Sequence, residues 1–245
     1  MQRFVSLILL CALLGAVVLL PACSKVGSSL NGSGKIVDQD IDVADFNSVN
    51  AKGQFQLKIA QADEPRVILS TDDNLVSRVI IVLDRKTLKL SIEAPSTFFP
   101  TSLTITIAMP QLVGLNLSGG AGATLSGFKS PQPFSLFMAD KGTLDGDIDA
   151  GTVNFNLSGT STAVLKGGAA SMDLTAVDTS KLDLSGFTLL RAKVNLDQSS
   201  EAIVNVSGQF DVTLNNKSKI FFLGNPIFTN TYVANGSSMS MVQPK

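Results

Sequence analysis

Histidine and tryptophan are absent from this sequence of 245 residues, which holds one tyrosine and two cysteines. Without histidine the chain cannot form a Ser-His-Asp triad, a Cys-His pair or a histidine-ligated metal site. The two thiols, Cys11 and Cys23, lie in or directly after an apolar N-terminal run. The rest of the chain therefore has no thiol for a disulfide, and its fold must be stabilised by packing alone.

Charged residues are also few. They make up 16% of the chain, and the formal net charge is -1, so we expect no basic surface and no nucleic-acid partner. Glycine is frequent, at 20 residues, and occurs beside many Ser, Thr, Asn, Val and Leu residues. This mixture is typical of an all-β chain with many tight turns, and no segment shows sustained helical spacing.

The N-terminus has the layout of a secretory signal. Arg3 gives a positive start, and an uncharged apolar run follows from Phe4 to Leu20. The run is short and ends in small residues, which favours a cleaved signal over the alternative of a single membrane-spanning helix. Leu20-Pro21-Ala22-Cys23 resembles a bacterial lipobox, with Pro21 in place of the usual Ala or Ser. This resemblance implies cleavage before Cys23 and lipidation of that residue.

The alternative is that Cys23 merely ends the leader as a small apolar residue. Ser24 resembles the outer-membrane address of enteric lipoproteins, and the Ser- and Gly-rich residues up to Lys35 are typical of a flexible tether. We therefore predict a protein lipid-anchored to the bacterial cell envelope, at the outer membrane. The predicted parts are a lipoprotein signal peptide at 1–22, a lipidated Cys and tether at 23–35, an N-terminal β region at 36–110, and regular repeats with a C-terminal cap at 111–245.

One seven-residue phrase recurs through the second half of the chain. Its clearest copy runs from Leu157 to Ala163, and its pattern is an apolar residue, a turn former in third place, a small residue in fifth and an apolar residue in seventh. The copies begin at Leu117, Met138, Leu157, Ala176, Leu196, Leu214 and Val233, so the spacings are 21, 19, 19, 20, 18 and 19 residues. A period near twenty predicts a solenoid, here a single-stranded parallel β-helix with coils of about 19 residues.

Aligned copies place like residues in columns. Six of the seven third residues are Gly, Asn or Asp, which accept a left-handed backbone, so this column predicts a corner: Gly119, Asp140, Gly159, Asp178, Gln198, Asn216 and Asn235. The fifth residues are small and can stack hydroxyls along the ladder: Ala121, Gly142, Ser161, Ser180, Ser200, Ser218 and Ser237. The first and seventh residues are expected to fill the interior.

The front half shows strand patterns without the regular phrase. Alternation at 55–59, 88–92 and 103–107 predicts strands with one buried face, and continuous apolar runs at 67–69 and 79–83 predict strands covered on both faces. Residues 49–55 resemble an early copy of the phrase. For the aromatic pair Phe98-Phe99 we expect folding back over an open end of the core, with an exposed contact site as the alternative.

Three segments resemble the bacterial family called putative auto-transporter adhesin, head GIN domain. They are residues 37–46, Asp72-Asp-Asn-Leu75, and the Gly-rich stretch 115–127. The resemblance covers the chain from about Ile36 to its end. It implies a right-handed parallel β-helix on an exported, often lipid-anchored protein, and it brings no catalytic residues.

One acidic run is a candidate metal site. Asp145, Asp147 and Asp149 alternate, so on a strand they share a face that could hold Ca²⁺. The calcium-loop pattern fails because its twelfth position is Asn156, so a solvated face is favoured and neither a metal nor another cofactor is predicted. The run Asp38, Asp40 and Asp42 is interpreted in the same way.

These features favour a non-enzymatic envelope protein whose β-helix flank binds a polysaccharide or a surface protein. The alternatives are a polysaccharide lyase or hydrolase, which would need the acids at 145–149 to converge with Lys141 or Lys166, and an envelope scaffold or sensor. Apolar residues at 220–223 and 239–241 are interpreted as a C-terminal cap. The alternative for them is a patch for self-association into a homo-oligomer.

Overall fold

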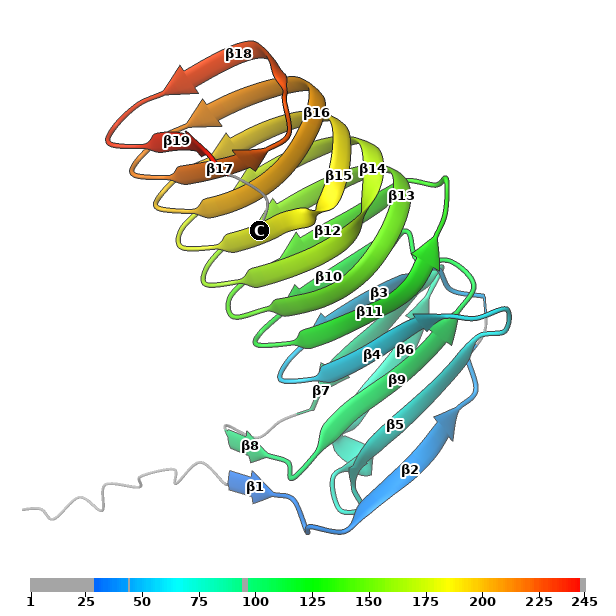
Figure 1. Cartoon of the computed structure of the whole chain (residues 1–245). Helices are drawn as coiled ribbons and strands as arrows, with labels where there is room; N and C mark the ends of the chain where they lie inside the picture. The colour runs from blue at the N-terminus through cyan, green and yellow to red at the C-terminus, as the bar shows by residue number, and fades with distance from the viewer. Residues whose placement is uncertain (1–28, 44, 94–96, 243–245) are drawn as a thin grey trace, which may run out of the picture.

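A computed structural model of the chain describes residues 29–43, 45–93 and 97–242. These residues form a β-solenoid whose coils lie on one another like the turns of a spring (Figure 1). The regular elements are β1 (Ser29–Asn31), β2 (Ile36–Ile41), β3 (Ser48–Lys52), β4 (Gln56–Gln61), β5 (Arg66–Asp72), the 3-10 helix η1 (Val76–Arg78), β6 (Val79–Asp84), β7 (Thr87–Ile92), β8 (Thr97–Phe99), β9 (Leu103–Met109), β10 (Gly114–Ser118), β11 (Gly122–Lys129), β12 (Phe134–Met138), β13 (Thr143–Leu157), β14 (Thr162–Ala176), β15 (Lys181–Leu196), β16 (Glu201–Leu214), β17 (Lys219–Leu223), β18 (Ile227–Val233) and β19 (Ser238–Met241). Within the described ranges, no helix has the length and apolar character needed to cross a membrane.

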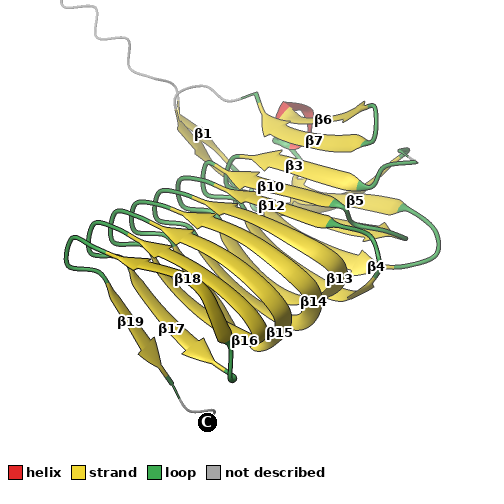
Figure 2. Ribbon diagram, turned by 90° about the horizontal axis from the view of Figure 1, so that it is seen from above, coloured by secondary structure: helices red, strands yellow, loops and turns green. Residues whose placement is uncertain are grey.

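The predicted coil of about 19 residues is confirmed by the strand register. In the parallel ladders Leu117 lies opposite Met138, Met138 opposite Leu157, and Leu157 opposite Ala176. The series continues in register through Leu196 and Leu214 to Val233. Strands β13 to β16 each bend round most of one coil, so every coil hydrogen-bonds to the coils before and after it (Figure 2).

All seven residues of the corner column have positive φ angles, between 53° and 68°. Neighbouring corners are also joined by side chains. The N–H of Gly119 donates to Asp140 Oδ2 at 2.9 Å, and the N–H of Gly159 donates to Asp178 Oδ2 at 2.8 Å. A glycine and an aspartate in successive coils therefore make one corner contact, which explains why these two residues alternate.

The small residues of the fifth column lie beneath the corners. Ser161, Ser180, Ser200 and Ser218 are all 0% exposed. Their hydroxyls donate mainly to backbone carbonyls, for example from Ser180 to Val177 O at 2.8 Å and from Ser200 to Ala176 O at 2.9 Å. In the described chain a hydroxyl–hydroxyl contact along this column occurs at one step, from Ser218 to Ser237 at 3.3 Å. Most of these serines thus donate to backbone carbonyls at the corner that also accept a backbone N–H.

The interior is filled by the apolar columns. Leu117, Leu157, Leu196 and Leu214 are at most 2% exposed. Beside them Phe134, Phe155 and Phe187 stack edge to face, with ring centroids 6.1 and 6.4 Å apart. Such aromatic pairs each add about 0.5–1.5 kcal/mol beyond their burial.

The solenoid begins before the regular repeats. Strands β3 and β4 form a coil that pairs in parallel with β10 and β11 on one side and with β7 and β9 on the other. Ala51 lies opposite Leu117. The early copy of the phrase therefore starts at Ala51, and the predicted start at Val49 is wrong by two residues because alternation alone does not fix the register.

Antiparallel strands cover the N-terminal end: β5 pairs with β9 and β2, and β6 pairs with β7. The prediction that residues 79–83 are covered on both faces is wrong, because β6 is an edge strand in which Ile80 is 40% and Val82 is 50% exposed. Strand β5 alternates between inward and outward residues. From the sequence, Phe98-Phe99 is expected to fold back over an open end of the core. This prediction is wrong for Phe99, which lies opposite Asn31 in the ladder and is 58% exposed.

Replacing the corner glycine should cost more than replacing a glycine in open space. Gly159 and Gly127 both have positive φ, but a Cβ at 159 would lie 2.7 Å from the carbonyl oxygen of Asp140, whereas nothing lies within 4 Å at 127. Gly127→Ala should lower the free energy of unfolding by about 1–2 kcal/mol through backbone strain alone, and Gly159→Ala by at least about 1 kcal/mol more. Urea unfolding followed by circular dichroism measures both, and equal losses would contradict the close approach of neighbouring corners.

Candidate functional site

The outward residues of one solenoid flank form two parallel columns in which most side chains are polar. Strands β7, β3, β10, β12 and β13 place Lys89, Asn50, Asn116, Phe137 and Asn156 side by side in one column. The second column, in the same strand order, is Thr87, Ser48, Gly114, Ser135 and Asn154. Neighbouring members are spaced by the separation of hydrogen-bonded strands, about 4.8 Å. We call this flank the amide face.

A hollow of about 380 Å³ lies in the amide face. Gly114 brings no side chain to its floor, while Asn50, Asn116 and Asn156 line it and Phe137 stands beside them, 46% exposed. The amide of Asn156 donates to Asn154 Oδ1 at 2.9 Å, which fixes the orientation of both side chains. The lining residues carry no charge: they are Ser48, Val49, Asn50, Thr87, Gly114, Leu115, Asn116, Ser135, Leu136, Phe137, Asn154 and Asn156.

This lining suits a neutral ligand that is rich in hydroxyl groups. Each asparagine amide offers two donors and an acceptor oxygen, and each Ser or Thr hydroxyl can both donate and accept. An exposed phenyl ring adds an apolar surface against which the C–H face of a ring-shaped ligand can pack. Charged residues border the hollow at its two ends. Lys89 lies beside Asn50 in the ladder, and Asp173 lies beside Asn154.

The amide face is not among the sites that the sequence patterns predict. Its columns join β10, β12 and β13, which the phrase copies align, to β3 and β7 of the front half, where the phrase is not regular. The detectable signal was local: Asn116 alternates with Leu115 and Leu117, and Asn154 and Asn156 flank Phe155. Such alternation places these amides on the outer face of a strand, but it does not say which strands become neighbours.

The acidic run lies on the other flank of the solenoid. Asp145, Asp147 and Asp149 are exposed along the first half of β13. Asp147 Oδ2 accepts a hydrogen bond from the N–H of Gly127 at 2.9 Å, and in register it lies opposite Lys166. Among the described residues there is no group of three His, Cys, Asp or Glu side chains that could hold a metal ion.

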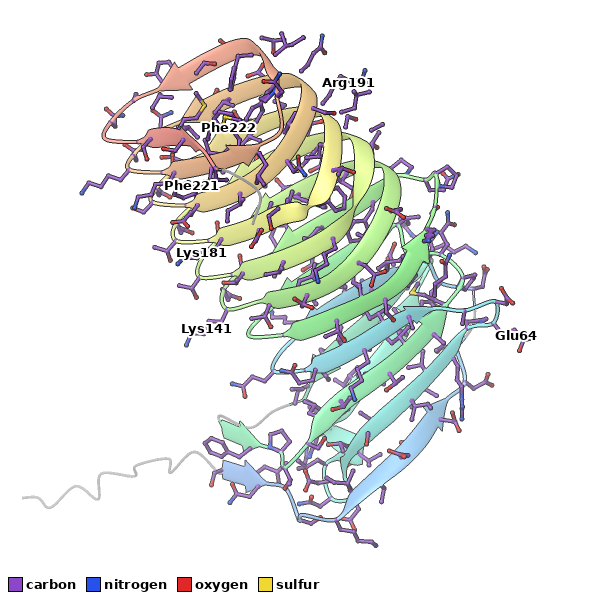
Figure 3. All side chains as sticks on the ribbon, in the orientation of Figure 1. Glu64, Lys141, Lys181, Arg191, Phe221 and Phe222 are labelled. Carbon is purple, nitrogen blue, oxygen red and sulfur yellow. The ribbon has the colours of Figure 1, made fainter. Side chains whose placement is uncertain are left out.

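Lys141 and Lys166, the basic residues that a lyase site would need, lie apart from each other. Lys166 is on β14 beside Asp147, whereas Lys141 projects from the corner edge, as Lys181 does, opposite the edge that carries Arg191 (Figure 3). Lys141 lines a second hollow of about 580 Å³ with Gln54, Gln56 and Phe99. Of the other acidic run, Asp40 is paired with Arg66, at 3.0 and 3.2 Å.

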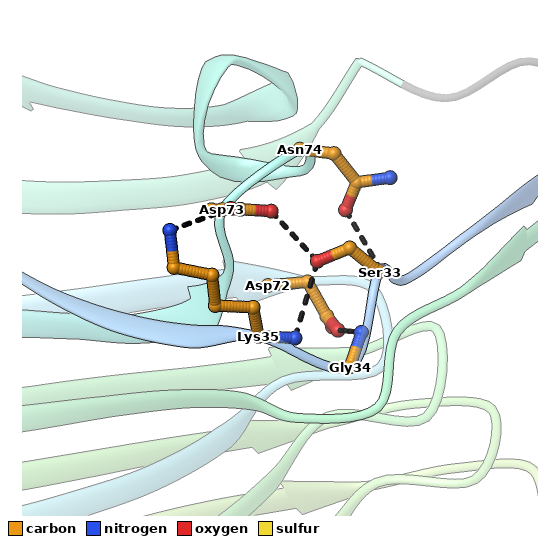
Figure 4. Close-up of polar contacts among 6 residues, drawn as sticks. All are labelled: Ser33, Gly34, Lys35, Asp72, Asp73 and Asn74. Carbon is orange, nitrogen blue, oxygen red and sulfur yellow. Dashed lines mark hydrogen bonds and ion pairs between the residues drawn. The ribbon is translucent and has the colours of Figure 1, made fainter.

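The chain enters the solenoid through a clamp between residues 33–35 and residues 72–74 (Figure 4). Ser33 Oγ donates to Asp73 Oδ1 at 2.6 Å, and the N–H of Gly34 donates to Asp72 Oδ1 at 2.8 Å. Asn74 accepts from the N–H of Ser33 at 3.0 Å. The described part of the predicted tether, residues 29–35, is therefore held against the fold. Leu20, Pro21, Ala22 and Cys23 lie outside the described residues.

Asp72 is the centre of this clamp and is 0% exposed. Burial raises the pKa of its carboxyl group, but hydrogen bonds from Gly34, Thr101 and Ser102 outweigh burial, so the net pKa lies below the ordinary value. The N–H of Thr101 donates to Asp72 Oδ2 at 2.8 Å. A Cβ on Gly32 would come within 2.4 Å of the same carboxylate. The motif Asp72-Asp-Asn74 thus joins the incoming chain to the loop before β9.

Comparison with known proteins gives a family and a fold. The family described as putative auto-transporter adhesin, head GIN domain, matches residues 45–226. A putative adhesin from Bacteroides fragilis has a similar structure, with a TM-score of 0.78 and 17% identity, over 87% of this chain and 99% of that one. No curated protein sequence matches the chain.

Two solved structures from Parabacteroides distasonis are also similar. One is a putative lipid binding protein, with a TM-score of 0.69 and 16% identity, over 88% of this chain and 100% of that one. The other is a putative adhesin, with a TM-score of 0.67 and 17% identity, over the same shares of the two chains. At these identities the likeness concerns the fold alone.

The clamp should weaken in acid through Asp72. A carboxyl group whose pKa is lowered by folding stabilises the protein above its unfolded pKa, about 3.9, and this contribution is lost as the pH falls through the lower folded value. Asp72→Asn should cost about 1.5–3 kcal/mol at pH 7, from the hydrogen bonds to the charged group. The difference in free energy of unfolding between the wild type and Asp72→Asn should then shrink below about pH 4.

This difference is measured by urea unfolding at a series of pH values from about 2 to about 7. The control is Asp63→Asn, in the exposed loop between β4 and β5. A cost of Asp72→Asn that stays constant over this range would show that the charge of the carboxylate does not hold the clamp.

Proposed function

The chain belongs to the putative auto-transporter adhesin, head GIN domain family, and on this premise we propose that it is a non-enzymatic adhesion protein of the bacterial cell envelope that binds a neutral polysaccharide through the amide face. The observation that carries the proposal is the uncharged hollow in which Asn50, Asn116 and Asn156 stand beside the exposed Phe137. Amides and a phenyl ring together match the two sides of a sugar, its hydroxyl groups and its C–H face.

The rigidity of the amide face supports the same proposal. Its strands are paired on both sides within the solenoid, so the backbone positions of Asn116 and Phe137 are fixed before a ligand arrives. A ligand that meets a preorganised row of donors and acceptors loses less conformational freedom of the protein on binding. The regular separation of the coils further favours a ligand that itself repeats, such as a polymer.

The second part of the proposal is a lipid anchor on Cys23. It is supported by the lipobox-like Leu20-Pro21-Ala22-Cys23 and by the clamp at residues 33–35, which would leave only a short linker between the membrane and the solenoid. Acyl chains contribute about 0.8 kcal/mol for each CH₂ group buried in a bilayer, so several chains would hold the protein permanently. The outer membrane is the proposed site, since Ser24 follows the cysteine.

Removing single groups from the amide face should weaken glycan binding. We expect Asn116→Ala and Phe137→Ala each to raise the dissociation constant for a neutral glycan about five- to tenfold, because one hydrogen bond or ring contact contributes about 1 kcal/mol. A neutral glycan array identifies the ligand, and titration calorimetry then measures the variants. The chain from Ser24 onward serves for both, because every described strand lies within residues 29–241.

Matched controls exist on the other flank. Asn205→Ala and Phe221→Ala remove the same side-chain types from β16 and β17 and should leave the affinity unchanged. Equal loss in the controls, or binding that survives both amide-face changes, would refute the amide face as the binding site. Release of unsaturated uronates from a polysaccharide would overturn the non-enzymatic part of the proposal.

The anchor is tested by labelling cells that make the full chain with palmitate. The wild type and Cys11→Ala should take up the label and sediment with membranes, whereas Cys23→Ala should take up none, because it lacks the acylated sulfur and the new amino terminus. Cys11 lies in the leader and controls for the loss of a thiol. Label on Cys23→Ala would contradict lipidation at this residue.

A further inference from the structure

The C-terminal end of the solenoid exposes a whole coil. In the described chain β18 pairs with β16 alone and β19 pairs with β17 alone, so each has one free backbone edge. These strands form the end farthest from β1 and β2 (Figure 1). All seven residues of β18 are exposed. The last coil therefore has the inner columns of the repeat without a following coil to cover them.

The surface of this end is uncharged and carries several exposed apolar side chains. Ile227 is 69% exposed, Val233 42% and Met241 55%. Beneath them Phe210, Phe222 and Phe228 form a trio with ring centroids 5.4 to 6.1 Å apart, and Phe222 lies at this end in Figure 3. Between Lys219 and Lys245 the sequence contains no charged residue, although charged residues make up 16% of the whole chain.

Soluble proteins normally protect free strand edges with charges, proline or bulges. β19 carries none of these, and β18 has a single irregularity of register near Thr229. The opposite end of the solenoid is protected: antiparallel strands cover it, and the edge strand β2 carries Asp38 and Asp40. Two molecules would therefore not join C-terminal end to N-terminal end, because an apolar coil would meet a charged edge.

We propose that two copies of this protein pair tail to tail through the terminal coil, from Ile220 to Met241. A two-fold axis perpendicular to the strands places β18 beside β18 of the second copy in antiparallel order, and β19 beside β19. Such an interface must be self-complementary. An uncharged surface meets this requirement because it brings no like charges together when it contacts itself. Interfaces of standard size use about 20–30 residues from each partner, and the terminal coil is long enough to supply that number.

Tail-to-tail pairing leaves the amide face open. It also puts the two N-terminal ends at the outer ends of the pair. In combination with the proposed anchor on Cys23, this arrangement would hold two membranes together, and that consequence rests on the proposed function. The pairing itself does not depend on the anchor or on any glycan.

The test is the molar mass of the chain from Ser24 onward in solution, measured by light scattering and sedimentation without a glycan. The wild type should be a dimer that dissociates on dilution. Val233→Lys and Met241→Lys place a charge on different strands of the terminal coil, at side chains that are already exposed. Each should raise the dissociation constant of the dimer at least about tenfold, because two lysines would meet across the axis.

The control is Thr213→Lys, which adds the same charge one coil earlier, on the outer face of β16 opposite Tyr232. It should remain dimeric, and circular dichroism should show the same fold for all three variants. A monomeric wild type at all concentrations, or equal weakening by Thr213→Lys, would overturn the proposal. Loss of dimerisation in either terminal-coil variant with the fold intact would support it, even where the other variant does not fold.

Discussion

Each coil of this solenoid must reverse its direction within a few residues at the same place, directly above the reversal of the coil before. The backbone achieves this with left-handed residues at the corner, and all seven corner residues have φ between 53° and 68°. L-residues lose about 1–2 kcal/mol in this conformation unless they are Gly, Asn or Asp. The choice of residues at one position per coil therefore permits the stacking, and the stacking in turn fixes the inner apolar columns and the outer polar ones.

The corner contacts also couple one coil to the next. Asp140 and Asp178 accept hydrogen bonds from glycine N–H groups of the preceding coil, and buried serines donate to backbone carbonyls at the turn. A continuous ladder results in which β13 to β16 pair along nearly their full length. The outer columns have the same regular order, and in the hollow of the amide face their side chains are uncharged. The terminal coil keeps the same columns but, in the described chain, has no following coil, so β18 and β19 each have a free strand edge that carries no charge.

Residues in the second half of the chain were sufficient to predict the coil, because each repeat contacts its neighbours in sequence and the spacing is visible directly. The front half was harder to predict. The phrase-like match at residues 49–55 indicates a coil but places it two residues out of register. The apolar run at 79–83 predicts a strand buried on both faces, although β6 lies at an edge. Burial at an edge depends on which strand pairs next, and sequence pattern does not contain that information. The amide face was missed in part for the same reason, because its columns extend from β10, β12 and β13 onto β3 and β7 of the front half.

The account assigns ligand binding to a small set of asparagine amides, and their NH₂ resonances can be observed directly. Side-chain amide spectra of the isotope-labelled chain, recorded while a neutral oligosaccharide is added, test the assignment. The account predicts saturable shifts for Asn50, Asn116, Asn154 and Asn156, with those of Asn205 and Asn216 unchanged. Shifts confined to the corners or to the other flank, with the amide face silent at saturation, would contradict it.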